Sequence, residues 1–272
     1  MIDCRLVLSD VDGTLAYEKS LVSEENRKWI AKLVDEKRVP FALVSGRMRS
    51  GIATIAAQIP APVALCAFNG GYVEVDGKPI HQEFMDYDLA LEVVRISHSY
   101  GVECVLFDLD EWYAEKGGRL YDIQASLYGF GGHAVDLEET LGEWKRIRHP
   151  LYKCIPKTQD PAKATMLRDE IQKKMGDRIS VFQSSPFVVE TVKKGVDKAN
   201  VVRILSAYYR IFPSQVMAFG DYDNDIGMLK ASGYGVAMAN GLDSVKRVAC
   251  FVTDTNKNDG VAKAIRKYFF EE

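Results

Sequence analysis

The 272-residue chain lacks the features that mark secreted and membrane proteins. It contains no apolar stretch of about 18 residues or more, the length a membrane-spanning helix needs. Residues 1–6 lead directly into the first apolar run, without the basic region, apolar core and cleavage site of a secretory signal. We therefore expect a cytoplasmic protein that is neither secreted nor inserted in a membrane.

Cysteine and histidine are scarce and are not spaced as metal ligands. The five cysteines are an odd number and form no Cys-x-x-Cys pair, so they are interpreted as small buried hydrophobic residues in a reducing compartment. The four histidines also lack metal-ligand spacing, which disfavours a zinc site. A catalytic Cys-His pair is the weaker alternative. The residues are Cys4, Cys66, Cys104, Cys154 and Cys250, with His81, His98, His133 and His149.

Charge of one sign does not dominate either, since 35 Lys and Arg stand against 38 Asp and Glu, for a net charge of −3. Without a long basic run, neither a nucleic-acid groove nor a surface for anionic membranes is expected. The 47% hydrophobic composition can build a sizeable core, and the length exceeds the commonest size of one domain, so two domains are expected. The oligomeric state is left open.

The most informative residues present are two carboxylates, Asp10 and Asp12, after the apolar run Leu6-Val7-Leu8. In an extended strand, residues i and i+2 point the same way, so both acids can address one reacting centre while Gly13 lets the chain turn. Alone, such a pair also occurs in calcium loops and turns. Three more polar segments lie next to apolar or helical runs. Ser45-Gly46-Arg47 and the cluster Asp221, Asn224 and Asp225 each follow an apolar run, and Lys198 opens a helical run.

In this order, these four pieces resemble the haloacid dehalogenase-like phosphohydrolase superfamily, and within it the Cof-type phosphatases with a large cap domain. The stretches 68–71 (FNGG) and 256–262 (NKNDGVA) are also similar to minor motifs of that family. The resemblance extends over nearly the whole chain. It implies an α/β fold, with a Rossmann-like parallel-sheet core and an inserted α+β cap.

The outer parts of the chain alternate strands and helices, which predicts a parallel sheet covered by helices on both faces. We assign residues 1–82 and 188–272 to this core. The expected strands are 6–9, 41–44, 63–68, 216–219, 235–238 and 250–252, and the expected helices are 23–37, 49–58, 198–209 and 226–231.

The middle, about 83–187, is predicted as the antiparallel cap domain, with strands joined by a tight Ser-Pro turn. The expected helices are 90–100 and 163–175, and the expected strands are 102–106, 151–155, 179–183 and 187–191.

Charge predicts a cation at the acidic site. A phosphate monoester brings about two negative charges, and like charges about 4 Å apart cost about 4 kcal/mol per pair at an effective dielectric of 20. All the candidate ligands are oxygen atoms, which favours Mg²⁺. We expect the metal to contact Asp10, Asp221 and a backbone carbonyl at Asp12, with Lys198 supplying the remaining positive charge.

The resemblance also implies a role for each residue. Asp10 would be the nucleophile that forms an aspartyl-phosphate, and Asp12 the general acid and base; spacing alone would allow these two to be exchanged. Ser45, Gly46, Arg47, Asn69, Lys198 and Asn224 would bind the phosphoryl group or the substrate, and Asn224 and Asp225 would orient Lys198 or a metal-bound water.

Each of these residues also has a purely structural interpretation. Lys198 could be an ordinary solvated helix residue, Ser45 could cap the following helix, and Asn69 could be a turn residue. An ion pair between Arg47 and the cap is as plausible as a substrate contact.

The substrate is expected to be a small phosphorylated metabolite, such as a sugar phosphate or a cofactor phosphate, chosen by the cap. The glycine-rich loop 128–133 could lie over the site through Phe130, and Trp112, Tyr113 and Tyr121 could stack on a ring, although such aromatics are more often core residues. A phosphosugar mutase and a non-catalytic sensor of phosphorylated metabolites are the alternatives to a phosphatase.

Overall fold

The computed structural model describes residues 2–128 and 132–271, which form two compact units. The core unit comprises residues up to 47, 52–82 and 197 onward, and the cap unit comprises 48–51 and 83–196. The split after residue 82 coincides with the expected one. The expected end of the cap at 187 is wrong, because β13 (Val188–Lys193) is hydrogen-bonded in the cap sheet to β11 (Lys153–Lys157) and β12 (Ile179–Ser185).

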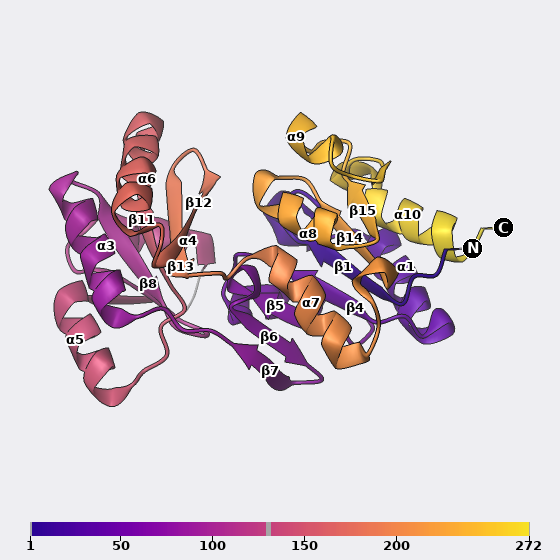
Figure 1. Cartoon of the computed structure of the whole chain (residues 1–272), viewed down its shortest axis with the longest axis horizontal. Helices are drawn as coiled ribbons and strands as arrows, with labels where there is room; N and C mark the ends of the chain where they lie inside the picture. The colour runs from indigo at the N-terminus through magenta and orange to yellow at the C-terminus, as the bar shows by residue number, and fades with distance from the viewer. Residues whose placement is uncertain (1, 129–131, 272) are drawn as a thin grey trace. The chain divides into compact units, whose positions relative to one another are not determined.

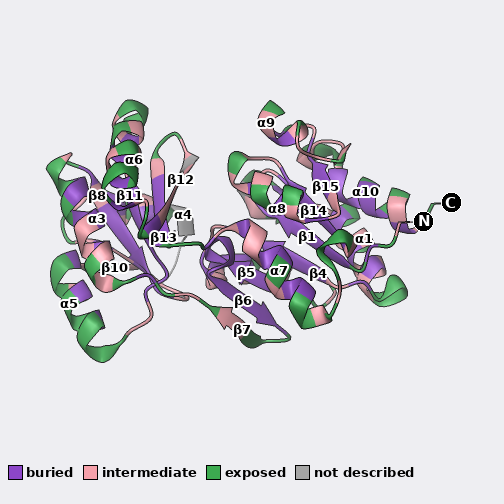
Figure 2. Cartoon of the chain, in the orientation of Figure 1, coloured by how far each residue is buried: buried purple, intermediate pink, exposed green. Residues whose placement is uncertain are grey.

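The core sheet has eight strands in the order β16-β15-β14-β1-β4-β5-β6-β7 (Figure 1). The six from β16 to β5 pair in parallel, as predicted, whereas β6 and β7 add an antiparallel edge that was not predicted. The central strands are buried along their length because both faces are covered, and this explains their continuous apolar sequences (Figure 2). The strands are β1 (Leu6–Asp10), β4 (Phe41–Val44), β5 (Ala64–Ala67), β6 (Tyr72–Val75), β7 (Lys78–Gln82), β14 (Val216–Gly220), β15 (Tyr234–Ala237) and β16 (Phe251–Val252).

Helices cover the core sheet, and α7 and α8 bury Val201, Leu205 and Met228 in a cluster on one face. On α1, the Ser23 side chain accepts a hydrogen bond from the Asn26 backbone N–H at 3.1 Å, so Ser23 caps the start of this helix. A small hairpin, β2 (Ala16–Tyr17) and β3 (Leu21–Val22), follows the first strand. The helices are α1 (Glu24–Lys37), α2 (Arg49–Ala56), α7 (Lys198–Tyr209), α8 (Ile226–Ala231), α9 (Asp243–Lys246) and α10 (Gly260–Phe269).

The cap unit is a six-stranded sheet in the order β10-β9-β8-β11-β13-β12. Apolar residues of α3, α5 and α6 form one buried cluster with one face of this sheet. The elements are β8 (Glu103–Phe107), β9 (Trp112–Glu115), β10 (Gly132–Val135), α3 (Tyr87–Ser99), α4 (Leu120–Tyr128), α5 (Leu137–Ile147) and α6 (Pro161–Met175), with the three strands named above. The sequence did not predict β9, α4, β10 or α5, and β10 pairs with β9 in parallel although an antiparallel module was expected.

Two further expectations concern composition. Cys4, Cys66, Cys104 and Cys154 are buried free thiols as expected, but Cys250 is exposed. Across the part of the chain that the structure describes, no helix is both long and apolar enough to cross a bilayer.

Candidate active site

Three neighbouring parallel strands of the core bring their carboxyl ends to one edge of the sheet. Asp10 ends β1, Ser45 follows β4, and Asp221 follows β14. The register pairs Ser9 with Phe219 and Asp10 with Val44, so the three ends lie at the same level. In open α/β sheets this edge is where ligands bind.

Lys198, the first residue of α7, is buried in this site rather than solvated. Its Nζ donates to Oδ1 of Asp10 and to Oδ1 of Asp225, both at 2.6 Å, and only 2% of the residue is exposed. Burial works against the lysine cation, but the two carboxylates outweigh it and hold the pKa of Lys198 above its usual range. Lys198 therefore supplies a fixed positive charge beside Asp10.

Asp221 and Asp225 complete an acidic cluster with Asp10. The three residues each offer a carboxylate oxygen, and these oxygens lie within 4.8 Å of one another. Oδ2 of Asp225 accepts the backbone N–H groups of Asp221 and Tyr222, both at 3.0 Å, which holds the Asp225 carboxylate in place. Thr14 donates from Oγ1 to Oδ1 of Asp221 at 2.7 Å.

The cluster carries more negative charge than Lys198 neutralises. Burial raises the pKa of Asp10 well above its usual value despite the Lys198 ammonium. Burial also raises the pKa of Asp221 to about 6, against the opposing hydrogen bond from Thr14. Ionised carboxylates at these positions therefore call for a second cation, and a set made only of oxygen donors fits Mg²⁺.

Gly13 is required by the close approach of its turn to Asp221. Its φ is +85°, a conformation that side chains disfavour, and a Cβ at this position would lie 2.4 Å from Oδ2 of Asp221. The glycine therefore allows the chain to turn directly after Asp12 without displacing the Asp221 carboxylate.

Asp12 is exposed, and Arg47 binds its carboxylate with two hydrogen bonds. Arg47 Nε donates to Oδ2 at 2.8 Å, and Nη2 donates to Oδ1 at 2.5 Å and to the Ser20 hydroxyl at 2.7 Å. The sequence left Arg47 between a substrate contact and an ion pair with the cap. The structure joins it to the expected acid/base residue and to the hairpin that follows β1.

Ser45 and Asn69 lie in two loops that are bonded to each other. Ser45 is buried, and its hydroxyl accepts the backbone N–H of Arg47 at 3.2 Å, a bond within the turn that precedes α2, which begins at Arg49. The backbone N–H of Asn69 donates to the Ser45 carbonyl at 2.9 Å. Asn69 has φ of +56°, so its turn interpretation also fits. Gly46 is half-buried between Ser45 and Arg47.

Two asparagines that the sequence did not assign connect the C-terminal segment to the turn after β1. Nδ2 of Asn240 donates to the Gly13 carbonyl at 2.8 Å, and Oδ1 of Asn240 accepts the backbone N–H of Asn256 at 2.9 Å. Nδ2 of Asn256 donates to the Ala16 carbonyl at 3.0 Å. Asn256 lies in the 256–262 stretch, whose similarity to a minor motif of the family indicated this segment but no function for it. No pattern in the sequence indicated Asn240.

Some expected residues are not brought to the cluster. Asn224 is half-buried in a short 3₁₀ turn, and within residues 2–128 and 132–271 no hydrogen bond joins it to Lys198. Trp112 is buried against Tyr121, with ring centroids 5.3 Å apart. Tyr113 packs on Trp144, with centroids 4.7 Å apart, as the core interpretation of these aromatics predicts. Phe130 lies outside the described residues.

Known proteins are similar to this chain in both sequence and fold. Residues 7–265 match the family of haloacid dehalogenase-like hydrolases. The 5-amino-6-(5-phospho-D-ribitylamino)uracil phosphatase YitU of Bacillus subtilis (strain 168) is 31% identical over 271 residues, covering 97% of each chain. YcsE, a second 5-amino-6-(5-phospho-D-ribitylamino)uracil phosphatase of the same organism, is 29% identical over 275 residues, covering 98% of this chain and 96% of its own. The crystal structure of a haloacid dehalogenase-like hydrolase from Bacteroides thetaiotaomicron superposes with a TM-score of 0.85 and 27% identity, covering 98% of this chain and 100% of the other.

Proposed function

Because the chain belongs to the haloacid dehalogenase-like hydrolase family and is a Cof-type phosphatase, we propose that it hydrolyses small phosphorylated metabolites with Mg²⁺ through an aspartyl-phosphate. One observation carries this proposal: a buried carboxylate, Asp10, lies against the Lys198 ammonium inside a cluster of three acids. The proposed nucleophile, a buried cation and candidate metal ligands thus lie together at one sheet edge.

The oxygen donors of Asp10 and Asp221, with the backbone carbonyl of Asp12, are the groups proposed to hold Mg²⁺. Asp225 is the third acid of that cluster. Its Oδ1 accepts from Lys198 and its Oδ2 accepts two backbone N–H groups, so its role is to orient that lysine. Bound at this site, Mg²⁺ would offset the charges of the carboxylates and of the phosphoryl oxygens.

The reaction proceeds in two displacements at phosphorus. A carboxylate oxygen of Asp10 attacks phosphorus, the bond to the leaving oxygen breaks, and that oxygen takes a proton from Asp12. In the second displacement Asp12 removes a proton from water, the water oxygen attacks phosphorus, and the bond between Asp10 and phosphorus breaks. Asp12 is suited to both proton transfers because its side chain is exposed beside the buried nucleophile.

The residues around the nucleophile would bind the phosphoryl oxygens. Lys198 and the Ser45 hydroxyl supply donors, and Gly46 lets a backbone N–H approach. Arg47 holds the Asp12 carboxylate in position through two hydrogen bonds. Asn69 supports the Ser45 loop through its backbone, and Asn224 remains a candidate for substrate contact.

The substrate is proposed to be a sugar phosphate or a cofactor-related phosphate. The names of YitU and YcsE make 5-amino-6-(5-phospho-D-ribitylamino)uracil the first compound to test, since it combines a phosphorylated sugar alcohol with a heterocycle. We place the reaction in the cytoplasm, a location that the four buried free thiols suit.

A panel of phosphorylated metabolites, assayed with Mg²⁺ and again with excess chelator, tests this function. Release of inorganic phosphate that stops on chelation and returns with Mg²⁺ is expected. Asp10→Asn keeps the shape of the side chain and should lower turnover by several orders of magnitude, about the size of effect expected for loss of a nucleophile. Transfer of the phosphoryl group to a second sugar position would indicate a mutase, and tight binding without turnover a sensor. Full activity in chelator would contradict the role of the metal.

A further inference from the structure

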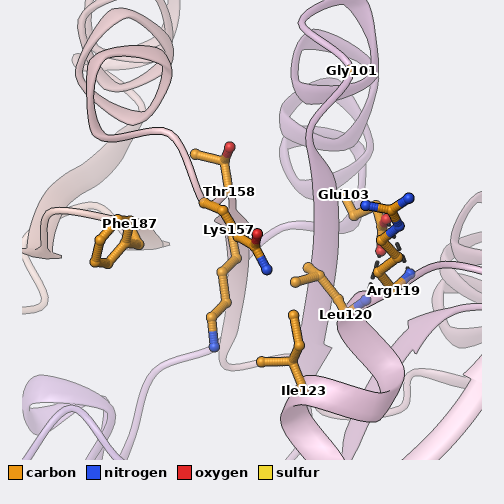
Figure 3. Close-up of a pocket in the computed structure, with 9 residues that line it drawn as sticks. Gly101, Glu103, Arg119, Leu120, Ile123, Lys157, Thr158 and Phe187 are labelled. Carbon is orange, nitrogen blue, oxygen red and sulfur yellow. Dashed lines mark hydrogen bonds between the residues drawn. The ribbon is translucent and has the colours of Figure 1, made fainter.

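The cap unit contains a pocket of about 570 Å³ whose lining residues all belong to that unit (Figure 3). It lies where the end of β11 and the turn between β12 and β13 face the start of α4. This volume is within the range of small-molecule binding sites, which is about 300–1,000 Å³.

Apolar side chains form the walls of the pocket. Leu120 and Ile123 come from α4, and Phe187 comes from the turn between β12 and β13. Phe187 is 41% exposed, although a large aromatic ring usually finds a buried place. These three side chains offer an apolar surface to the body of a ligand.

Lys157, the last residue of β11, brings a half-buried positive charge to the pocket. Its ammonium donates to the neutral Oε1 of Gln124 at 2.8 Å, and burial lowers the pKa of Lys157. Among the described residues no carboxylate forms an ion pair with Lys157. Lys153, four residues earlier on the same strand, lies 3.5 Å from the carboxylate of Glu190. Of the two lysines on β11, the buried Lys153 thus has a counter-ion on β13, whereas the half-buried Lys157 has none among the described residues.

Glu103 is the acidic residue of the pocket, and its charge is already engaged. Its two carboxylate oxygens accept the backbone N–H groups of Arg119 and Leu120, at 3.1 and 2.9 Å, where α4 begins. The Arg119 side chain adds a second cation to the lining and, within the described ranges, forms no ion pair. The pocket therefore carries an excess of positive charge beside apolar walls.

We propose that this pocket binds an organic anion of metabolite size, with its carboxylate or phosphate on Lys157 and its apolar body against Leu120, Ile123 and Phe187. Such an anion supplies the counter-charge that the fold gives to Lys153 but not to Lys157. The anion is either the organic part of the enzyme's own substrate or a separate metabolite, because both present the same chemistry to the pocket.

The probe is indole-3-acetate, and indole-3-acetamide is its uncharged counterpart. Binding of each probe to the intact protein is measured by titration calorimetry and ligand-observed NMR. Neither probe carries a phosphate, so no reaction accompanies the binding. The carboxylate should bind about tenfold more tightly than the amide or better, the size expected of a charge-assisted contact. Lys157→Met should remove that difference, while Lys173→Met, at an exposed lysine of α6 outside the pocket, should leave it unchanged.

Phe187→Ala tests the apolar wall without altering Lys157, and it should weaken both probes. Equal affinity for carboxylate and amide, or binding that neither Lys157→Met nor Phe187→Ala weakens, would overturn the proposal. Competition identifies the source of the ligand. Displacement of the probe by the enzyme's substrate, or by a product that keeps a carboxylate or a second phosphate, assigns the pocket to the substrate, and displacement only by other anions assigns it to an effector. The titrations with indole-3-acetate and indole-3-acetamide do not depend on the phosphatase mechanism, whereas the competition experiment rests on the proposed function.

Discussion

Replacing Lys198 by methionine removes the cation that separates the buried acids while keeping a similar side-chain length. Asp10 and Asp225 then lose their shared partner, and the cluster oxygens, which lie within 4.8 Å of one another, are left with like charges. At that distance and an effective dielectric of about 20, each ionised pair repels by about 3.5 kcal/mol. Removing one partner of a buried ion pair costs about 3–5 kcal/mol. We expect Lys198→Met to lower the free energy of unfolding by that amount near neutral pH.

The pH dependence of this loss follows from the sign of the pKa shifts. When the pKa of a carboxyl group is higher in the folded than in the unfolded chain, the folded state becomes less stable as the pH rises above the unfolded pKa. Below the unfolded pKa the group is protonated in both states and has no effect on stability. Burial already raises the pKa of Asp10, and loss of Lys198 raises it further. The destabilisation should therefore be largest at about pH 7.5 and shrink as the pH falls to about 5. Added Mg²⁺ should recover part of it.

Urea unfolding followed by circular dichroism, in chelator and at both pH values, measures this effect. Lys230→Met is the matched control, because Lys230 is an exposed lysine at the end of α8, and its replacement should change stability by no more than about 0.5 kcal/mol. A loss below about 1 kcal/mol for Lys198→Met, or a loss of the same size at both pH values, would refute the electrostatic account of the site.

Three further predictions concern the same site. Asp12→Ala should slow hydrolysis of alkyl phosphates about a hundredfold or more, because their leaving oxygen needs a proton. The first displacement on aryl phosphates with good leaving groups should be slowed less, and equal losses of single-turnover rate on the two kinds of substrate would argue against Asp12 as the general acid. Because burial raises the pKa of Asp221 to about 6, protons compete with Mg²⁺, so calorimetry should find its affinity about tenfold weaker near pH 5 than near pH 7.5; a pH-independent affinity would exclude Asp221 as a ligand. Asn256→Ala removes the bond to the Ala16 carbonyl and should cost about 1–2 kcal/mol in urea unfolding. Asn258→Ala, which loses only a contact to Asp254, is its control, and equal effects would contradict the connection.

Elements with a complete local pattern were predictable. The strand Phe41–Val44 and the helix Ile226–Ala231 have the bounds that the sequence indicated. The start of α1 follows from Ser23, because an N-cap is decided by a few adjacent residues. Cap elements such as β9 and α4 were missed because the segments are short. The order of apolar and polar residues in them does not distinguish a strand or helix from a loop.

For the site, the sequence by itself determined the chemical groups and the strand ends that carry them: Asp10, Ser45 and Asp221 each follow a buried apolar run. A strand that is buried on both faces is largely apolar, so the polar and charged residues that end its apolar run mark the edge of the sheet. Partner choice was decided only by the tertiary structure. Lys198 meets Asp10 across 188 positions of the chain, and Asn240 meets the carbonyl of Gly13 across 227. The end of the cap is a further case, because the pattern indicated a strand over 187–191, but the expected boundary at 187 separated that strand from β11, with which it pairs. Periodicity within a segment records which face is buried, whereas the residue that meets a buried charge depends on how distant segments pack.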